Sequence, residues 1–201
     1  MQAILKILIY RLTGKGQIVI GSPISGRNRT ELEGLIGFFV NTLVFCTELR
    51  PDDDFEAVLE KVKETALGAY SHQDLPFEML AEKLHIERDL SQNPLYQIMF
   101  QGVAKNTPSN KGDDGLPTIS MGSAKFDLTV SFEDYLDGLV GLIEYNTDLF
   151  EAATIDRIIA LFQYLTHQLI EQPERAIREL SLVSETEEQR LIHDYNATAT
   201  D

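Results

Sequence analysis

The interleaving of helix-type and strand-type segments is the feature that most constrains the fold of this chain. Apolar residues recur at helical spacing over 3–12, 55–70 and 152–171, and a shorter helix is predicted over 76–84. Strands are predicted over 17–21, 38–49, 95–103, 126–134 and 138–146. Because both kinds of segment alternate around what can be a single sheet, the sequence predicts an α/β (α+β layered) domain, a mixed sheet with helices packed on it.

Individual residues mark where several of these segments end. Gly14 is a helix stop, Asp54 is an N-cap, and Pro76 begins the short helix. The turn Asp137-Gly138 joins the last two strands into a hairpin. A mobile surface loop is expected over 105–117 and a short acidic helix over 185–194.

Composition excludes several classes of function. The formal charge of −15 argues against nucleic-acid binding and indicates a solvated acidic surface or, alternatively, a basic partner. No apolar stretch is long enough for a membrane span. The single cysteine, Cys46, excludes an internal disulfide, fits the cytoplasm and is predicted to lie in the core.

Asn41 is the most informative polar residue, because it lies inside an apolar strand. An unpaired amide there would cost about 1–3 kcal/mol. Its side chain therefore either bonds a neighbouring backbone or faces an interior channel that substrate passes through. Ser22 and Arg27, in the preceding loop, are candidates for the same space.

The histidines give no catalytic or metal-binding pattern. His85 and Asp89 are spaced as in an acyltransferase signature, but Leu84 precedes and Leu90 follows where that signature has His and Gly. His72 is interpreted as part of a helix–helix joint, and His167 as a helix-surface residue. No combination of His, Cys and carboxylate has a metal-ligand spacing, so no metal is expected.

Three phrases resemble the second half of a nonribosomal peptide synthetase condensation domain of the peptide-bond-forming type. They are the segments 36–43, 71–78 and 87–95, which read IGFFVNTL, SHQDLPFE and ERDLSQNPL. The segments 19–27, 125–128 and 144–150, VIGSPISGR, KFDL and EYNTDLF, extend the resemblance. The ending YNAT at 195–198 resembles the lead-in to an adenylation domain.

The resemblance implies a fold, a domain boundary and a set of partners. It implies a chloramphenicol-acetyltransferase-like C-terminal lobe over 1–183 and the start of a linker to an adenylation domain over 184–201. The family's partners would be peptidyl carrier proteins, the N-terminal lobe and the adenylation domain. No cofactor would be bound by this chain, because the phosphopantetheine arm belongs to the carrier. The regions 22–39 and 105–125 would cross to the other lobe.

The resemblance also implies that this chain is inactive alone. The family's catalytic phrase, two adjacent histidines followed after three residues by Asp-Gly, does not occur in the 201 residues. The parent would be an amide-forming acyltransferase, and no catalytic residue is assigned here. The alternatives are a non-catalytic module that binds a carrier or the partner lobe, and a small acyltransferase that uses His85. Exposed apolar surface would favour self-association, including strand exchange between copies.

Overall fold

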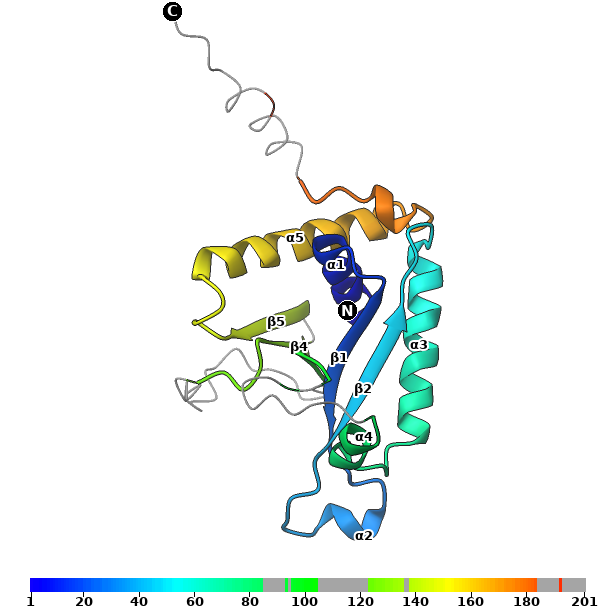
Figure 1. Cartoon of the computed structure of the whole chain (residues 1–201), viewed down its shortest axis with the longest axis vertical. Coiled ribbons are helices and arrows are strands. Elements are labelled where there is room, and N and C mark those ends of the chain that lie inside the picture. The colour runs from blue at the N-terminus through cyan, green and yellow to red at the C-terminus, as the bar shows by residue number, and fades with distance from the viewer. Residues whose placement is uncertain (85–92, 94, 105–122, 136–137, 184–191, 193–201) are drawn as a thin grey trace, which may run out of the picture.

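A single mixed sheet of five strands organises the molecule (Figure 1), which is described from a computed structural model. The structure describes residues 1–84, 93, 95–104, 123–135, 138–183 and 192. The strand order is β2-β1-β3-β4-β5. The bounds are β1 Gln17–Ile24, β2 Asn41–Glu48, β3 Ile98–Ala104, β4 Leu128–Tyr135 and β5 Gly138–Tyr145.

Pairing in the sheet is antiparallel at both sides and parallel in the centre. β1 pairs with β2 antiparallel, and β4 pairs with β5 in the same way. β3 lies parallel to both β1 and β4. The predicted mixed sheet is therefore confirmed, and β2 and β5 are its edge strands.

Three long helices cover one face of this sheet. They are α1 Gln2–Thr13, α3 Phe55–Ser71 and α5 Ala152–Glu171. Their apolar stripes meet Ile18 and Ile20 of β1 and Leu43 and Phe45 of β2 in the main hydrophobic core. The helical spacing seen in the sequence thus marks the buried face of each helix.

Two of the three predicted helix ends are formed as expected, and the third is shifted by one residue. Gly14 takes a left-handed conformation at φ 69°, and its N–H donates to the Tyr10 carbonyl. Asp54 caps α3 by accepting a hydrogen bond from the Ala57 N–H. Pro76 is the N-cap of the short helix α4 Phe77–Lys83, so the helix begins one residue later than predicted.

A small aromatic cluster lies on the opposite face of the sheet. Tyr96 is only 2% exposed, and its ring contacts those of Phe77 and Phe126 at centroid distances of 5.7 and 5.5 Å. Its ring lies directly on Gly21 of β1, where an added Cβ would be 2.3 Å from Tyr96 Cε2. Glycine is therefore required at position 21 because the ring occupies the space of any side chain.

Several boundaries differ from the sequence-based expectation. β1 continues to Ile24, because Ser22 and Pro23 keep their partners Leu43 and Thr42 in β2. β2 begins only at Asn41, so the apolar residues 38–40 precede the strand. The short helix α2 Thr30–Glu33 was not predicted.

Cys46 is exposed, so its predicted core position is wrong. Side chains alternate between the two faces of β2, and Leu43, Phe45 and Thr47 take the buried positions. Cys46 therefore points to the outer face of an edge strand.

The segment that follows α5 is joined to the turn before α3. The Phe55 N–H donates to the Pro173 carbonyl at 3.0 Å, and the Ile177 N–H donates to the Asp53 carbonyl at 2.8 Å. Ile177, in the 3₁₀ helix η1 Ile177–Glu179, and Leu180 are fully buried in the main core. Residues 173–180 therefore belong to the domain and close it.

Two predicted segments lie outside the described residues. They are the loop 105–117 and, apart from residue 192, the helix 185–194. Among the helices that the structure describes, none is long and apolar enough to cross a bilayer.

Candidate functional site

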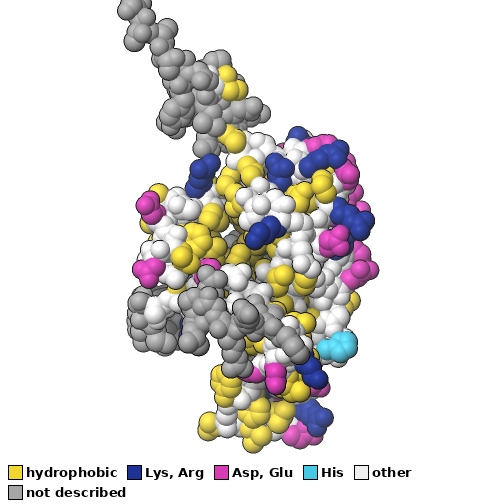
Figure 2. All heavy atoms as spheres, viewed as in Figure 1, with side chains coloured by type: hydrophobic (Ala, Val, Ile, Leu, Met, Phe, Trp, Pro, Cys, Tyr) yellow, Lys and Arg dark blue, Asp and Glu magenta, His cyan; other side chains and the backbone are white. Residues whose placement is uncertain are grey.

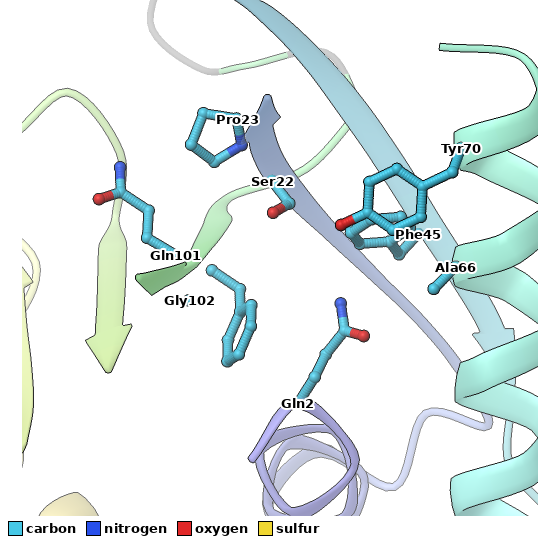
Figure 3. Close-up of a pocket in the computed structure, with 9 residues that line it drawn as sticks. Gln2, Ser22, Pro23, Phe45, Ala66, Tyr70, Gln101 and Gly102 are labelled. Atoms are coloured by element: carbon cyan, nitrogen blue, oxygen red, sulfur yellow. The ribbon is translucent and has the colours of Figure 1, made fainter. Parts of the chain in front are cut away.

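A cavity of about 290 Å³ lies where α1, β1, β2, α3 and β3 approach one another (Figure 3). The nine residues that line it come from all five elements. They are Gln2, Ser22, Pro23, Phe45, Ala66, Tyr70, Phe100, Gln101 and Gly102. The cavity therefore depends on the assembly of three adjacent strands with two of the helices.

Polar side chains meet in this cavity from different elements. The amide of Gln2 projects from the first turn of α1 toward Ser22 of β1 and Tyr70 of α3 (Figure 3). Ser22 is 8% exposed and shares the helix-covered face of β1 with Ile18 and Ile20. Its position in the strand thus places a hydroxyl where the core gives way to the cavity.

Three aromatic side chains, Phe45, Tyr70 and Phe100, line the cavity. Phe45 and Tyr70 contact each other at a ring-centroid distance of 6.0 Å and a tilt of 59°. Gln101 and Gly102 of β3 border the other side, where Ser131 of β4 lies 3.5 Å from the Gln101 amide oxygen.

The lining residues suit hydrogen bonding rather than proton transfer. None of the nine carries a carboxylate, an imidazole, an amine or a thiol. Amides, hydroxyls and aromatic rings can hold a ligand with amide groups and short alkyl segments.

Asn41 bonds neighbouring backbone rather than the cavity. Its Nδ2 donates to the carbonyls of Gln73 and Leu75, both at 2.9 Å. Its Oδ1 accepts from the N–H groups of Thr42 and Phe77 at 2.9 and 3.1 Å. These four bonds use the whole capacity of the amide, so Asn41 ties β2 to the α3–α4 junction.

Arg27 holds the loop that follows β1. Its guanidinium lies 4.4 Å from the centroid of the Phe39 ring and donates to the carbonyls of Leu32 and Glu33. Gly26, with φ 62°, allows the backbone to pass against Phe39, whose carbonyl oxygen would lie 1.9 Å from an added Cβ. Of the three predicted tunnel residues, only Ser22 lines the cavity. The tunnel role of the other two stays a prediction about a larger enzyme.

The described histidines occupy structural or surface positions. His72 Nδ1 lies 2.9 Å from both the Gly68 carbonyl and Ser71 Oγ, at the C-terminal end of α3. His167 is on the exposed side of α5. Positions 85, 89 and 193 lie outside the described residues. Within the described residues no cluster of His, Cys and carboxylate could hold a metal ion.

Gln2, Tyr70 and Gln101 were not predicted as site residues. Each belongs to an element whose periodicity was recognised, but a lone Gln or Tyr on a helix or strand carries no local signal. They line one cavity only because β1 lies between β2 and β3 and α1 packs across these strands.

The sequence matches known proteins along nearly its whole length. The family model described as "Condensation domain" matches residues 1–192. A linear gramicidin synthase of Brevibacillus parabrevis is 45% identical over 98% of this chain and 4% of its own length. Surfactin synthase subunit 1 of Bacillus subtilis (strain 168) is 38% identical over 96% of this chain and 6% of its own length. The chain thus spans only a small fraction of these relatives.

Solved structures share the fold. A holo four-domain nonribosomal peptide synthetase, bound to AMP and glycine, superposes with a TM-score of 0.83 and 25% identity over 93% of this chain and 16% of its own. The X-domain from teicoplanin biosynthesis gives a TM-score of 0.78 and 27% identity, covering 90% of this chain and 42% of its own. The predicted chloramphenicol-acetyltransferase-like layered α/β fold is confirmed.

Proposed function

Because this chain belongs to the condensation-domain family, we propose that it is the C-terminal lobe of a peptide-bond-forming condensation domain of a nonribosomal peptide synthetase. Residues 1–183 form the lobe, and residues 184–201 begin a linker toward an adenylation domain. The observation that carries this proposal is coverage: about nine-tenths of this chain corresponds to 42% of the teicoplanin X-domain chain. The X-domain chain is therefore more than twice as long as the part of it that corresponds to this chain.

In the parent enzyme, two carrier proteins present the reactants as thioesters. The acceptor amine attacks the donor carbonyl, an amide C–N bond forms, the C–S bond breaks and the donor thiol leaves after the amine has lost a proton. That proton requires a base, and the family's two adjacent histidines do not occur in this sequence. This lobe therefore supplies shape and hydrogen bonds rather than the base.

The cavity around Ser22 is the proposed section of tunnel wall. The pantetheine arm of a carrier has two amide groups joined by short alkyl segments, which fit the amides, hydroxyls and aromatic walls of this cavity. Gln2, Ser22 and Tyr70 would orient the arm. The arm stays covalently attached to the carrier, so this chain needs no bound cofactor of its own.

The loop that follows α2 is the proposed contact with the missing lobe. Ile36 and Phe38 have relative exposures of 105% and 89%, and apolar side chains gather at this tip of the molecule (Figure 2). Exposed apolar groups of this size favour burial against a partner. The second predicted crossing region, 105–125, lies largely outside the described residues.

An assay for dipeptide formation tests the assignment. The chain is incubated with aminoacyl-loaded donor and acceptor carriers, and the products are measured by mass spectrometry. We expect no dipeptide above buffer, because the family's histidine pair, which would serve as the base for the amine, does not occur in this sequence. Turnover by the isolated chain would contradict the proposal, and loss of that turnover in His85→Ala would instead support a self-sufficient acyltransferase.

The alternative of a non-catalytic binding module predicts carrier binding by the isolated lobe. The isotope-labelled chain is titrated with carrier protein, and the chemical shifts of the chain show which of its residues the carrier contacts. Shifts around Ser22 and Tyr70 would place the arm in the cavity. An absence of shifts up to millimolar carrier would count against docking on this lobe.

A further inference from the structure

The outer edge of β5 is an unprotected hydrophobic strand edge. Leu139, Val140 and Leu142 are 44%, 55% and 59% exposed, and Glu144 is the only charged residue of the strand. Among the described residues, no strand pairs with β5 on the side away from β4. A long apolar edge without Pro, Lys or a bulge is a template for pairing with another strand.

The opposite edge of the sheet is protected, which makes β5 exceptional. Helix α4 packs on β2, and the Asn41 side chain accepts the hydrogen bond of the Thr42 N–H. Glu48 adds an exposed charge at the far end of β2. These are the usual means by which proteins block edge-to-edge pairing.

The register of the β4–β5 hairpin shows which backbone groups of β5 face outward. The Asn146 N–H donates to the Asp127 carbonyl, one step beyond the pair Leu128↔Tyr145. Hydrogen-bonded pairs alternate along an antiparallel ladder, so even-numbered residues of β5 bond to β4. The N–H and C=O groups of Leu139, Gly141 and Ile143 therefore point to the open edge.

We propose that this edge pairs antiparallel with β5 of a second copy of the chain, about a two-fold axis at Gly141. Outward-facing residues must pair with outward-facing residues, so the two strands can slide only in steps of two residues. With Gly141 opposite Gly141, Leu139 faces Ile143 and Val140 faces Leu142. All these pairs are apolar, which favours cross-strand contact.

The position of Glu144 selects this register. With Gly141 at the axis, each Glu144 lies opposite Gly138, which has no side chain, and the two carboxylates lie at opposite ends of the ribbon. Sliding by two residues in one direction brings Glu144 opposite Val140, where a carboxylate would be held against an apolar side chain. Sliding by two residues in the other direction brings Leu142 opposite Gly138 and removes the contact between Val140 and Leu142. Because the sequence of β5 is complementary to itself in this register, the edge favours pairing with β5 of a second copy.

The groove beside β5 extends the same surface. Leu139, Gly141 and Ile143 line an apolar groove of about 510 Å³ between α1, α5 and the β4–β5 hairpin. In the paired form the two grooves would meet at the two-fold axis, which adds buried apolar area to the backbone hydrogen bonds. This inference does not depend on the proposed function.

Sedimentation velocity from micromolar to millimolar chain tests the proposal. We expect a reversible dimer whose dissociation constant rises at least about tenfold in Leu142→Lys, because a lysine on the edge blocks pairing. The matched control is Leu67→Lys on α3, where Leu67 is 60% exposed, and it should leave the constant unchanged. A monomer at all concentrations, or a dimer disrupted by Phe38→Ser instead of Leu142→Lys, would overturn the proposal.

Disulfide cross-linking tests the register independently of the size of the dissociation constant. Val140→Cys and Leu142→Cys are made separately in a Cys46→Ser background and mixed. Residues 140 and 142 of two copies form a close non-hydrogen-bonded pair, about 4.5 Å between Cα atoms, so the mixture should yield the heterodisulfide. Products are distinguished by mass. Homodisulfide yields as high as the yield of the heterodisulfide would contradict the register.

Discussion

Lys6 is the residue whose burial has the clearest energetic consequence. Its side chain is fully buried in the core beneath α1, where Nζ donates to the Phe45 carbonyl at 3.0 Å and to Thr47 Oγ1 at 2.6 Å. Both partners are uncharged. Removal from water lowers the pKa of this amine to about 8, and a Coulombic interaction with Cys46 opposes the shift.

This burial makes stability depend on pH. The folded state has the lower pKa, so below about pH 8 the amine is protonated in both states and folding bears the full cost of the buried charge. Between about 8 and the unfolded value, the unfolded state holds more protons, and stability rises with pH. From about pH 7.5 to 9.5 we expect the free energy of unfolding in urea to rise by about 2 kcal/mol more in the wild type than in Lys6→Met. Equal changes in both proteins would contradict this cause.

Asn41 is the second residue with a direct test. Asn41→Ala leaves two carbonyls and two N–H groups without their partner, so we expect a loss of about 2 kcal/mol in urea unfolding. The Phe77 amide should also exchange its hydrogen faster. Asn28→Ala is the matched control, because Asn28 makes one exposed hydrogen bond, to Asp74 at 3.1 Å. If both variants lost the same free energy of unfolding, the hydrogen bonds of Asn41 between β2 and the α3–α4 junction would not stabilise the fold as we describe.

At the scale of elements, glycine gives opposite predictions in helix α3 and strand β1. No atom lies within 4 Å of a Cβ built at Gly68 inside α3, whereas Tyr96 occupies that space at Gly21. Gly68→Ala should stabilise the protein by about 0.5–1 kcal/mol through helix propensity. Gly21→Ala should destabilise it by about 1–3 kcal/mol through overpacking. Thermal unfolding of both variants decides, and a destabilising Gly68→Ala would contradict the first expectation.

The edge strands show why elements cannot be judged one at a time. β2 and β5 are both edge strands of eight residues, but α4 packs on β2 and the Asn41 side chain accepts from the Thr42 N–H, whereas among the described residues no strand pairs with the outer edge of β5. The difference arises from neighbours distant in sequence, since the segment 73–77 supplies the groups that bind Asn41.

At the scale of the whole molecule, the segment after α5 completes the core. Leu180 is fully buried with Ile177, so Leu180→Ala should cost about 2–5 kcal/mol in urea unfolding. Leu182→Ala, at a half-buried position, is the matched control and should cost less. Deleting residues 184–201 should leave the unfolding midpoint unchanged if the lobe ends at 183. A lower unfolding midpoint in the shortened chain would show that the lobe extends beyond residue 183.

The sequence determined the elements and the family of this protein. Helical periodicity located α1, α3 and α5 to within two residues, because packing on a sheet requires a continuous apolar stripe. The motif phrases identified the condensation-domain family, which the comparisons show. The lobe assignment, the inactivity and the carrier partners rest on the same phrases and stay proposals.

The tertiary structure alone decided which residues share a site and which surface stays open. Ser22 lies 20 positions after Gln2 and 48 before Tyr70 along the chain, and only the strand order and the crossing of α1 bring them to one cavity. Asn41 and Cys46 lie in the same strand, yet one is held by four backbone bonds and the other faces outward. Periodicity is a property of local backbone geometry, whereas burial and hydrogen-bond partners depend on contacts between distant segments, which no local pattern records.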